Sequence, residues 1–254
     1  MPDKFFNQLT ALIADAGRSD LASDAADWLE FCLNKAAPPP AGAPAVKDRP
    51  AAEPEAAPTV SVVPGILPGT LSELEQQALN CRNCSLCRNR NKVVFGEGDP
   101  HAKLMFIGEG PGAEEDLSGR PFVGRAGELL TKMICAMQFT RQEVYIANIV
   151  KCRPPYNRAP MPEEAAGCLP YLQKQIDLIK PECIVLLGAS AAHFLLDQKE
   201  GITKLRGKWL DYRGIPVMPT FHPAFLLRQE SAKREAWQDL QQVMAKFGKT
   251  YRKK

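Results

Sequence analysis

Several features are scarce or missing in this sequence of 254 residues. It has no apolar run of about 18 residues, the length that a membrane-spanning helix needs. Its first residues, MPDKFFNQLTALIADAG, lack the basic start, apolar stretch and small-residue cleavage site of a signal peptide. No GK[ST] phosphate loop is present, and no GxGxxG stands in the right setting, which disfavours nucleotide binding of those kinds. We therefore expect a cytoplasmic protein without a membrane segment.

Charge is unevenly distributed along the chain. Residues 1–70 hold 5 Lys and Arg against 9 Asp and Glu, whereas residues 71–254 hold 27 against 20. The net charge of +3 is therefore −4 in the first segment and +7 in the rest. A basic body with an acidic leader suits a polyanionic partner, although the surplus alone is weak support.

The sequence divides into a leader, a linker and a body. Residues 36–70 contain 9 of the 22 prolines, a composition that favours extended chain and predicts a Pro/Ala-rich linker. Residues 1–35 carry apolar residues at helical spacing and predict a small helical N-terminal segment. Its apolar residues exceed what two short helices can bury, so a protein partner is one hypothesis for it and a dispensable extension is the other.

The body, residues 71–254, alternates apolar runs with helical patterns. Strands are expected over 103–109, 144–150 and 183–188, helices over 125–138 and 162–179, and a further strand before the loop of TFHPAFLLR. An amphipathic helix with a basic tail ends the chain. The alternation predicts an α/β fold with a parallel sheet, in which ligands bind outside the carboxyl ends of the strands.

Eight cysteines in a cytosolic chain favour metal or cluster ligation over disulfides. Cys81 and Cys84 in CRNCSLC, with Cys152 and Cys168, supply four thiolates from two distant parts of the chain. Their spacing fits zinc or an iron-sulfur cluster equally well. Cys87 is interpreted as a nearby thiol that ligates nothing, and three others are expected in the core: Cys32, Cys135 and Cys183.

The motifs GEGPGAEED, GRPFVGRAG, NIVKCRPPYNRAP and TFHPAFLLR, together with the cysteine spacing, resemble the family 4 uracil-DNA glycosylases of bacteria and archaea. The resemblance covers residues 74 to about 246. It implies a parallel four-stranded sheet between helices, a 4Fe-4S cluster on Cys81, Cys84, Cys152 and Cys168, and removal of uracil from DNA as the first step of base excision repair.

The resemblance also implies roles in a pocket that receives the flipped base. Phe122 would stack on uracil. Asn148 would read O4 and N3–H, which rejects cytosine. A neutral or protonated His222 would donate to O2, assisted by backbone N–H groups of the GEGPG turn around Gly110, and so stabilise the leaving group.

Acidic and basic residues complete the predicted site. Glu109 and Glu115 are expected to orient the attacking water and steady the sugar cation, and Glu109 to wall the pocket near C5. Glu114, with Asp116 as a second candidate, would instead serve the helix dipole. For DNA, Leu226 is the expected wedge beside Arg228, and backbone contacts are expected from three more cations: Lys151, Arg153 and Arg158.

A second class of function is an iron-sulfur DNA-binding or electron-transfer module without glycosylase activity. Such a module has no use for the constellation of Phe122, Asn148 and His222, and an acidic turn is out of place in a cleft for phosphates. A related glycosylase branch that cross-links to uracil-DNA is disfavoured, because KCRPPYNRAP lacks the His-bearing insertion expected of that branch.

Overall fold

The computed structural model describes residues 69–250, which fall within one compact unit, Val62–Arg252. The predicted helical segment 1–35 and nearly all of the predicted linker 36–70 lie outside these described residues, so both remain predictions. No helix in the described part is both long and apolar enough to cross a membrane.

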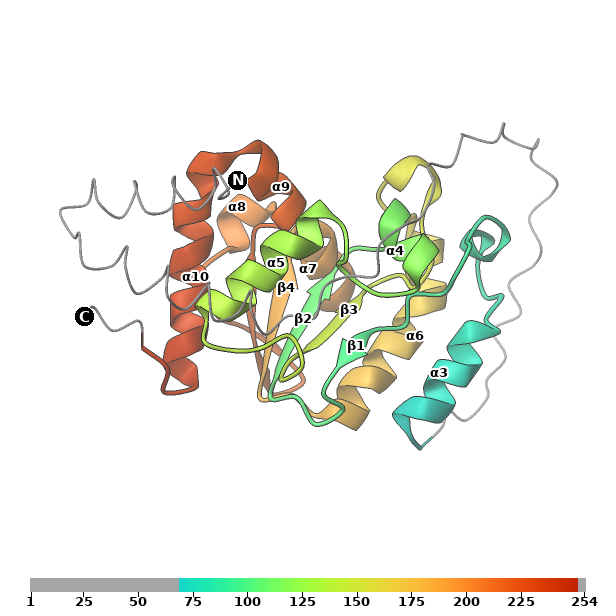
Figure 1. Cartoon of the computed structure of the whole chain (residues 1–254), viewed down its shortest axis with the longest axis horizontal. Coiled ribbons are helices and arrows are strands. Elements are labelled where there is room, and N and C mark those ends of the chain that lie inside the picture. Colours follow the sequence, from blue (N-terminus) through green and yellow to red (C-terminus); the bar gives the residue numbers. More distant parts are fainter. Residues whose placement is uncertain (1–68, 251–254) are drawn as a thin grey trace. The chain divides into compact units, whose positions relative to one another are not determined.

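A mixed sheet in the order β1-β3-β2-β4-β6-β5 forms the middle of the molecule (Figure 1). Its centre consists of β3 (Tyr145–Asn148), β2 (Leu104–Gly108), β4 (Cys183–Leu187) and β6 (Ile215–Thr220), all mutually parallel. Two short antiparallel strands, β1 (Glu97–Gly98) and β5 (Leu210–Tyr212), close the edges. The predicted parallel sheet is confirmed, but the described sheet has six strands and not four.

The central strands are buried on both faces, as strands covered by two helical layers must be. All residues of β2, β3 and β4 are buried. Met105 and Ile107 of β2 join a core with Leu74 and Ile176, while the alternate residue Phe106 is fully buried outside that cluster. Because the side chains on both faces of these strands are buried, their sequences are continuous apolar runs and not alternating ones.

Helices cover both faces of the sheet. One layer contains α3 (Leu71–Leu79), α6 (Pro162–Ile179) and α7 (Ala189–Leu196). In this layer α3 contacts α6, α6 contacts α7, and α7 packs against β2 and β4. The other contains α5 (Arg125–Ala136), α9 (Pro223–Arg228) and α10 (Lys233–Lys246), with α10 against β6. In Figure 1, α10 lies left of the central strands, and α6 and α3 lie right of them. The predicted three layers are confirmed.

Short elements connect this framework: α4 (Ala113–Ser118), α8 (Ile202–Leu205) and the 3-10 turns Ser85–Arg88, Pro155–Asn157 and Glu230–Ala232. Helix α3 was not predicted from the sequence, although Thr70 and Glu73 form a capping box at its start. The TFHPAFLLR segment, expected to be a loop, instead contains α9, which begins immediately after His222.

Candidate active site and cysteine cavity

The carboxyl ends of the parallel strands bring the predicted base-binding residues to one edge of the sheet. Strand β2 ends at Gly108, just before Glu109; β3 ends at Asn148; and β6 ends two residues before His222. These segments are distant in sequence but adjacent here, because β3, β2, β4 and β6 are neighbours and run in the same direction. The expected position of the ligand site relative to the sheet therefore agrees with the topology.

Asn148 and Phe122 converge above Gly108. A Cβ built on Gly108 would lie 2.5 Å from the Oδ1 of Asn148 and 2.5 Å from the Cζ of Phe122. The Oδ1 atom is buried and has no hydrogen-bond partner among the described residues, and the asparagine is only 1% exposed. Since buried acceptors are nearly always satisfied, this atom points to a donor on a ligand.

Phe122 occupies a constrained loop. Its φ angle is +51°, in the left-handed region that non-glycine residues rarely adopt. A Cβ on Gly127 would lie 1.9 Å from the carbonyl oxygen of Phe122, so only glycine fits there. The Arg141 guanidinium donates to the carbonyl of Pro121 next to it. Strain of this kind persists where surrounding contacts enforce it, and it is concentrated at functional sites.

The carboxylate of Glu115 joins this loop to the GEGPG turn. One oxygen accepts from the backbone N–H of Gly112 at 3.0 Å, and the other accepts from Val123 at 2.9 Å and Gly124 at 3.0 Å. These bonds span α4 and both glycine-rich motifs. Glu115, predicted to act on water, therefore holds the segment after Phe122 in place.

The other acids of α4 differ from one another. Glu114 is exposed, as expected of a residue that only favours the helix dipole. Asp116 is buried and accepts from the backbone and side chain of Asn91. Asp116 is thus a structural contact to the segment before β1.

His222 caps α9 with its ring. The Nδ1 atom accepts from the backbone N–H of Ala224 at 3.1 Å, so the ring proton is on Nε2. Burial, with the nearby Arg228, lowers the pKa of His222 to about 4. The ring lies 5.7 Å from that of Phe122, centroid to centroid. Of the two protonation states considered from the sequence, the neutral imidazole is the one that this environment favours.

Glu109 and Gly110 begin the turn that follows β2. The Glu109 carboxylate accepts a hydrogen bond from the hydroxyl of Ser190, near the start of α7. A Cβ on Gly110 would lie 2.7 Å from Val150, so glycine permits the close approach of this turn to the segment after β3. Both residues are partly exposed at the carboxyl edge of the sheet, beside Asn148.

Two residues predicted to contact DNA are not on the surface. Leu226 is 2% exposed because α9 turns it toward the core, so its prediction as the wedge is corrected; Phe225 is the exposed apolar side chain of that helix. Lys151 is also 2% exposed and cannot reach a phosphate. Its proximity to Cys152 in the sequence misled the prediction.

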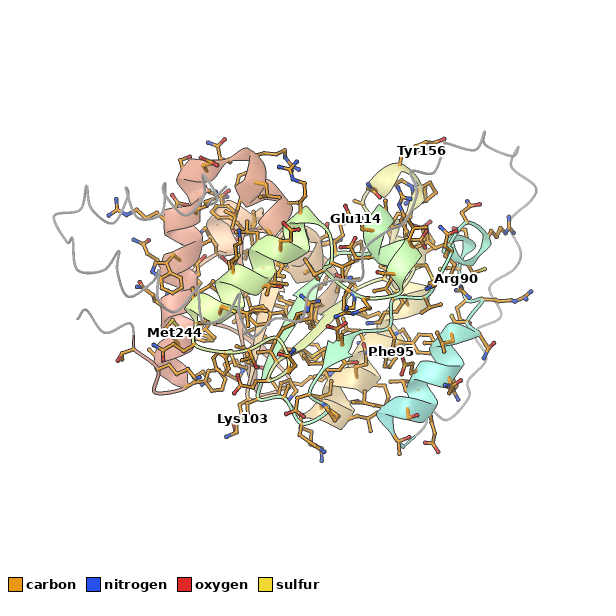
Figure 2. The ribbon with its side chains drawn as sticks, viewed as in Figure 1. Arg90, Phe95, Lys103, Glu114, Tyr156 and Met244 are labelled. Atoms are coloured by element: carbon orange, nitrogen blue, oxygen red, sulfur yellow. The ribbon has the colours of Figure 1, made fainter. Side chains whose placement is uncertain are left out.

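The predicted arginines also differ in their surroundings. Arg228 is exposed, and Arg153 donates to the side chain of Asn157 at 2.8 Å. Arg158 instead forms a two-pronged ion pair with Glu164, at 2.7 and 2.8 Å, and its position is structural. Tyr156, which lies between Arg153 and Arg158 in the sequence, is 89% exposed and projects from the end of the loop after β3 (Figure 2).

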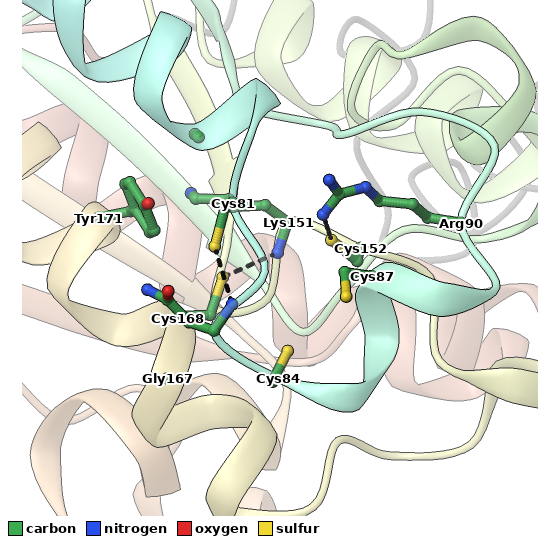
Figure 3. Close-up of a pocket in the computed structure, with 11 residues that line it drawn as sticks. Cys81, Cys84, Cys87, Arg90, Lys151, Cys152, Gly167, Cys168 and Tyr171 are labelled. Atoms are coloured by element: carbon green, nitrogen blue, oxygen red, sulfur yellow. Dashed lines mark hydrogen bonds between the residues drawn. The ribbon is translucent and has the colours of Figure 1, made fainter. Parts of the chain in front are cut away.

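Five cysteines line one cavity between the N-terminal part of the body and α6 (Figure 3). They include the four predicted ligands, Cys81, Cys84, Cys152 and Cys168, and also Cys87. Two remaining described cysteines, Cys135 and Cys183, are buried elsewhere, which confirms their prediction as core residues. Cys32 lies outside the described residues.

Hydrogen-bond donors surround the sulfurs of this cavity. The backbone N–H of Lys151 donates to Cys168 at 3.2 Å, and that of Asn83 to Cys81 at 3.5 Å. The Arg90 guanidinium donates to Cys152 at 3.2 Å. Burial raises the pKa of the Cys168 thiol to about 12. A thiolate at this depth therefore requires strong positive compensation, which a metal centre would supply.

The cavity brings thiols together from two distant parts of the chain. Among residues 69–250, no three His, Cys, Asp or Glu side chains are grouped so that they could hold one metal ion. The five cysteines that line the cavity include the four thiols that either structural zinc or a 4Fe-4S cluster requires as ligands.

Sequence reasoning missed several residues that shape the site. Gly108 belongs to the strand end that forms the pocket, and Ser190 bonds Glu109 from a helix far along the chain. Arg90 reaches Cys152 across 62 positions. Only Gly108 had a local signal, since it opens GEGPG. The other two depend on tertiary contacts that no local pattern specifies.

The fold and site define an α/β protein with an aromatic and polar pocket at the carboxyl edge of a parallel sheet. The family model of the uracil DNA glycosylase superfamily matches residues 95–241. A type-4 uracil-DNA glycosylase of Thermotoga maritima is 51% identical over 62% of this chain and 83% of its own length. Those of Sulfurisphaera tokodaii and Archaeoglobus fulgidus are 41% and 37% identical, over 68% and 71% of this chain and 83% and 94% of their own lengths. The chain belongs to the uracil-DNA glycosylase superfamily, in the type-4 group of these relatives.

Proposed function

We propose that the chain is a monofunctional uracil-DNA glycosylase that flips uracil out of DNA and hydrolyses its N-glycosidic bond, initiating base excision repair in the cytoplasm. The observation that carries the proposal is the buried, unpartnered Oδ1 of Asn148 beside the ring of Phe122. A planar base with an N–H donor on its edge fits both groups.

Base selection follows from the polarity of the Asn148 amide. Its Oδ1 accepts from N3–H of uracil while its Nδ2 donates to O4. Cytosine presents an acceptor at N3 and an amino group at C4, so both contacts become repulsive. Phe122 supplies the stacking face. Glu109, which accepts a hydrogen bond from Ser190, would wall the pocket near C5 and exclude the methyl group of thymine.

Leaving-group stabilisation is the task of His222. Cleavage leaves negative charge on the departing pyrimidine, and a fixed donor aimed at O2 lowers the energy of that state. The Nε2–H of a neutral imidazole is such a donor, because Nδ1 is engaged with Ala224. Backbone N–H groups around Gly110 assist.

Water activation is assigned to Glu109 rather than to Glu115. Glu109 accepts a hydrogen bond from the Ser190 hydroxyl and is partly exposed at the strand edge. Its carboxylate retains acceptor capacity for a water and can steady positive charge on the sugar. Glu115 contributes by positioning, through its three backbone N–H bonds.

DNA contacts are proposed for exposed and partly exposed residues around the site. Arg153 and Arg228 would contact phosphates, and Phe225 would take the role of wedge that Leu226 cannot fill. A wedge fills the gap left by the flipped nucleotide. Exposure of 37% for Phe225 is compatible with insertion at the protein surface.

A 4Fe-4S cluster on Cys81, Cys84, Cys152 and Cys168 is proposed as a structural element. When bound, it would link the segment before β1, the loop after β3 and helix α6 through covalent metal-thiolate bonds. Glu164 braces the same three parts, since it accepts from Ser85 at 3.0 Å and from Arg158. The chemistry of base removal is assigned to the pocket residues alone.

The alternative of an iron-sulfur DNA-binding or electron-transfer module is not favoured. It leaves the unsatisfied Asn148 oxygen and the strained Phe122 without a purpose. The type-4 relatives are also named uracil-DNA glycosylases.

A single-turnover assay on uracil-containing oligonucleotide tests the proposal. Asn148→Ala should slow excision by about 100- to 1,000-fold, because it removes base reading in the pocket, while iron content and the visible absorption of the protein stay unchanged. Asn89→Ala, at an exposed asparagine, is the matched control. A near-normal rate for iron-loaded Asn148→Ala would refute the assigned role.

For the N-terminal segment 1–35 we propose an interaction with a protein partner, because the leader of residues 1–70 is acidic and unsuited to DNA. A chain beginning at Gly69 keeps the Thr70 cap of α3. It should excise uracil from short oligonucleotides at the rate of the full chain. Loss of activity in a folded, iron-loaded truncation would place the leader within the catalytic domain.

A further inference from the structure

Lys151 is a fully buried cation beside the base pocket. Its ammonium donates to the backbone carbonyl of Asn148 at 2.9 Å and to the side-chain oxygen of Gln175 at 2.6 Å. The residue is 2% exposed, so both bonds are shielded from water. The lysine thus holds the backbone of Asn148, the residue with the proposed base-reading side chain, through a hydrogen bond to its carbonyl.

The backbone of the same residue contacts the cysteine cavity. Its N–H donates to the sulfur of Cys168 at 3.2 Å, and its carbonyl accepts from Val94 at 2.8 Å. Figure 3 shows Lys151 among the residues that line this cavity. A continuous path of hydrogen bonds therefore runs from the Cys168 sulfur through Lys151 to Asn148.

Gln175 fixes the position of the ammonium from the other side. Its amide nitrogen donates to the carbonyl of Phe95 at 3.0 Å and to the hydroxyl of Tyr145 at 3.1 Å. Gln175 belongs to α6, the helix that also carries Cys168. Tyr145 begins the strand that Asn148 ends. Lys151 and Gln175 together therefore connect α6 to both ends of β3.

Burial of an ammonium is costly, and replacing buried charge with apolar groups is often neutral or stabilising. Stability alone therefore gives a weak reason for a lysine at this place. Its specific consequence is geometric: the Asn148 peptide cannot rotate without breaking a charge-assisted bond to Lys151.

We propose that Lys151 is a positioning residue, which locks the Asn148 peptide to the cysteine-bearing helix α6 and so fixes the direction of the Asn148 amide in the base pocket. This inference rests on the proposed role of Asn148. According to the proposal, the structure around the cysteine cavity affects excision indirectly, because the hydrogen bonds of Lys151 connect Cys168 to Asn148.

Lys151→Met, which keeps the length of the side chain but removes the charge, tests the proposal. The iron-loaded variant should bind uracil-DNA as the unmodified protein does, and its single-turnover excision should be slower by about 100-fold, the effect of a small misplacement in an active site. Lys204→Met, at an exposed lysine of α8, is the control. Normal excision by iron-loaded Lys151→Met would overturn the proposal.

A double-mutant cycle separates positioning from general damage to the fold. If Lys151 acts through Asn148, the double variant Asn148→Ala with Lys151→Met should be no slower than Asn148→Ala alone. Losses that multiply would show an independent structural effect and overturn the proposal. If Asn148→Ala itself is normal, the proposed role of Asn148 fails instead, so the two failures are distinguishable.

Gln175→Leu decides the case if Lys151→Met does not fold or load iron. This substitution removes the second acceptor of the Lys151 ammonium, so that only the bond to the Asn148 carbonyl still positions the ammonium. Excision should then slow by about tenfold, within the range of effects seen for outer-shell partners, with iron and sulfide content retained. An unchanged rate in this variant would then overturn the proposal.

Discussion

The Oδ1 atom of Asn148 and the ring of Phe122 approach the same point above Gly108, where a Cβ would lie 2.5 Å from each. Glycine at the end of β2 therefore makes room for the two groups that would read and stack the base. The contact is set by tertiary structure, since these residues come from a strand end, a loop and a second strand.

Gly108→Ala should therefore damage the pocket. The methyl group must displace Asn148 or Phe122, and overpacking of this kind costs about 1–3 kcal/mol. We expect a lower melting temperature and excision reduced by about 100-fold, since the displaced groups are the reading and stacking residues.

Gly201→Ala is the control for that substitution, because a Cβ at Gly201 meets nothing within 4 Å and its φ is −68°. Thermal unfolding and single-turnover excision measure both effects. Unchanged excision by Gly108→Ala would mean that the base does not lie against Asn148 and Phe122.

The protonation of His222 gives a second prediction. Its pKa of about 4 lies below the ordinary value of 6.5, so the ring is neutral at pH 6. Excision should show no decline as the pH falls through 6.5, and should decline only near pH 4, where protonation of Nδ1 breaks the bond to Ala224.

The sign of the stability effect follows from the same pKa. The unfolded chain binds a proton at His222 below about pH 6.5, whereas the folded chain resists it down to about pH 4. This contribution to the free energy of unfolding is complete above pH 6.5 and is lost as the pH falls toward 4. His222→Gln should show less of that loss in acid unfolding curves, and NMR should show no His222 titration at neutral pH.

Glu115→Gln tests positioning against direct catalysis. One amide NH2 replaces a carboxylate oxygen that accepts backbone N–H groups, and leaving such donors unsatisfied costs about 1–3 kcal/mol. Both the melting temperature and the excision rate should fall, because the segment after Phe122 loosens. Glu114→Gln, at an exposed neighbour, should change neither. Reduced excision at an unchanged melting temperature would assign Glu115 to the chemistry.

Strands β2 and β4 were predictable from the sequence because each is an uninterrupted apolar run, LMFIG in β2 and CIVLL in β4. The edge strands were missed because β1 has two residues and β5 three, too few for a pattern. Local periodicity therefore predicted the layers, while pairing at the edges depended on neighbours.

Predictions for single side chains were less successful where burial depends on distant partners. Lys151 reads as a surface cation, yet its acceptor Gln175 lies 24 positions later. Leu226 was placed in a loop, and the turn of α9 directs it inward. By contrast, the strand expected over residues 144–150 contains Asn148, and the structure ends β3 at that residue.

The five cysteines of the cavity provide the last prediction. Cys87 lines the same cavity as the four proposed ligands, and a 4Fe-4S cluster has four irons to be ligated. Cys87→Ser should retain iron, sulfide and visible absorption, whereas Cys152→Ser should lose them and unfold at lower temperature, since metal-binding energy contributes to folding. The two serines differ from their cysteines by the same atom, so each variant controls for the other. Iron loss in Cys87→Ser would revise the ligand set, and stoichiometric zinc without iron or sulfide in the unmodified protein would refute the cluster.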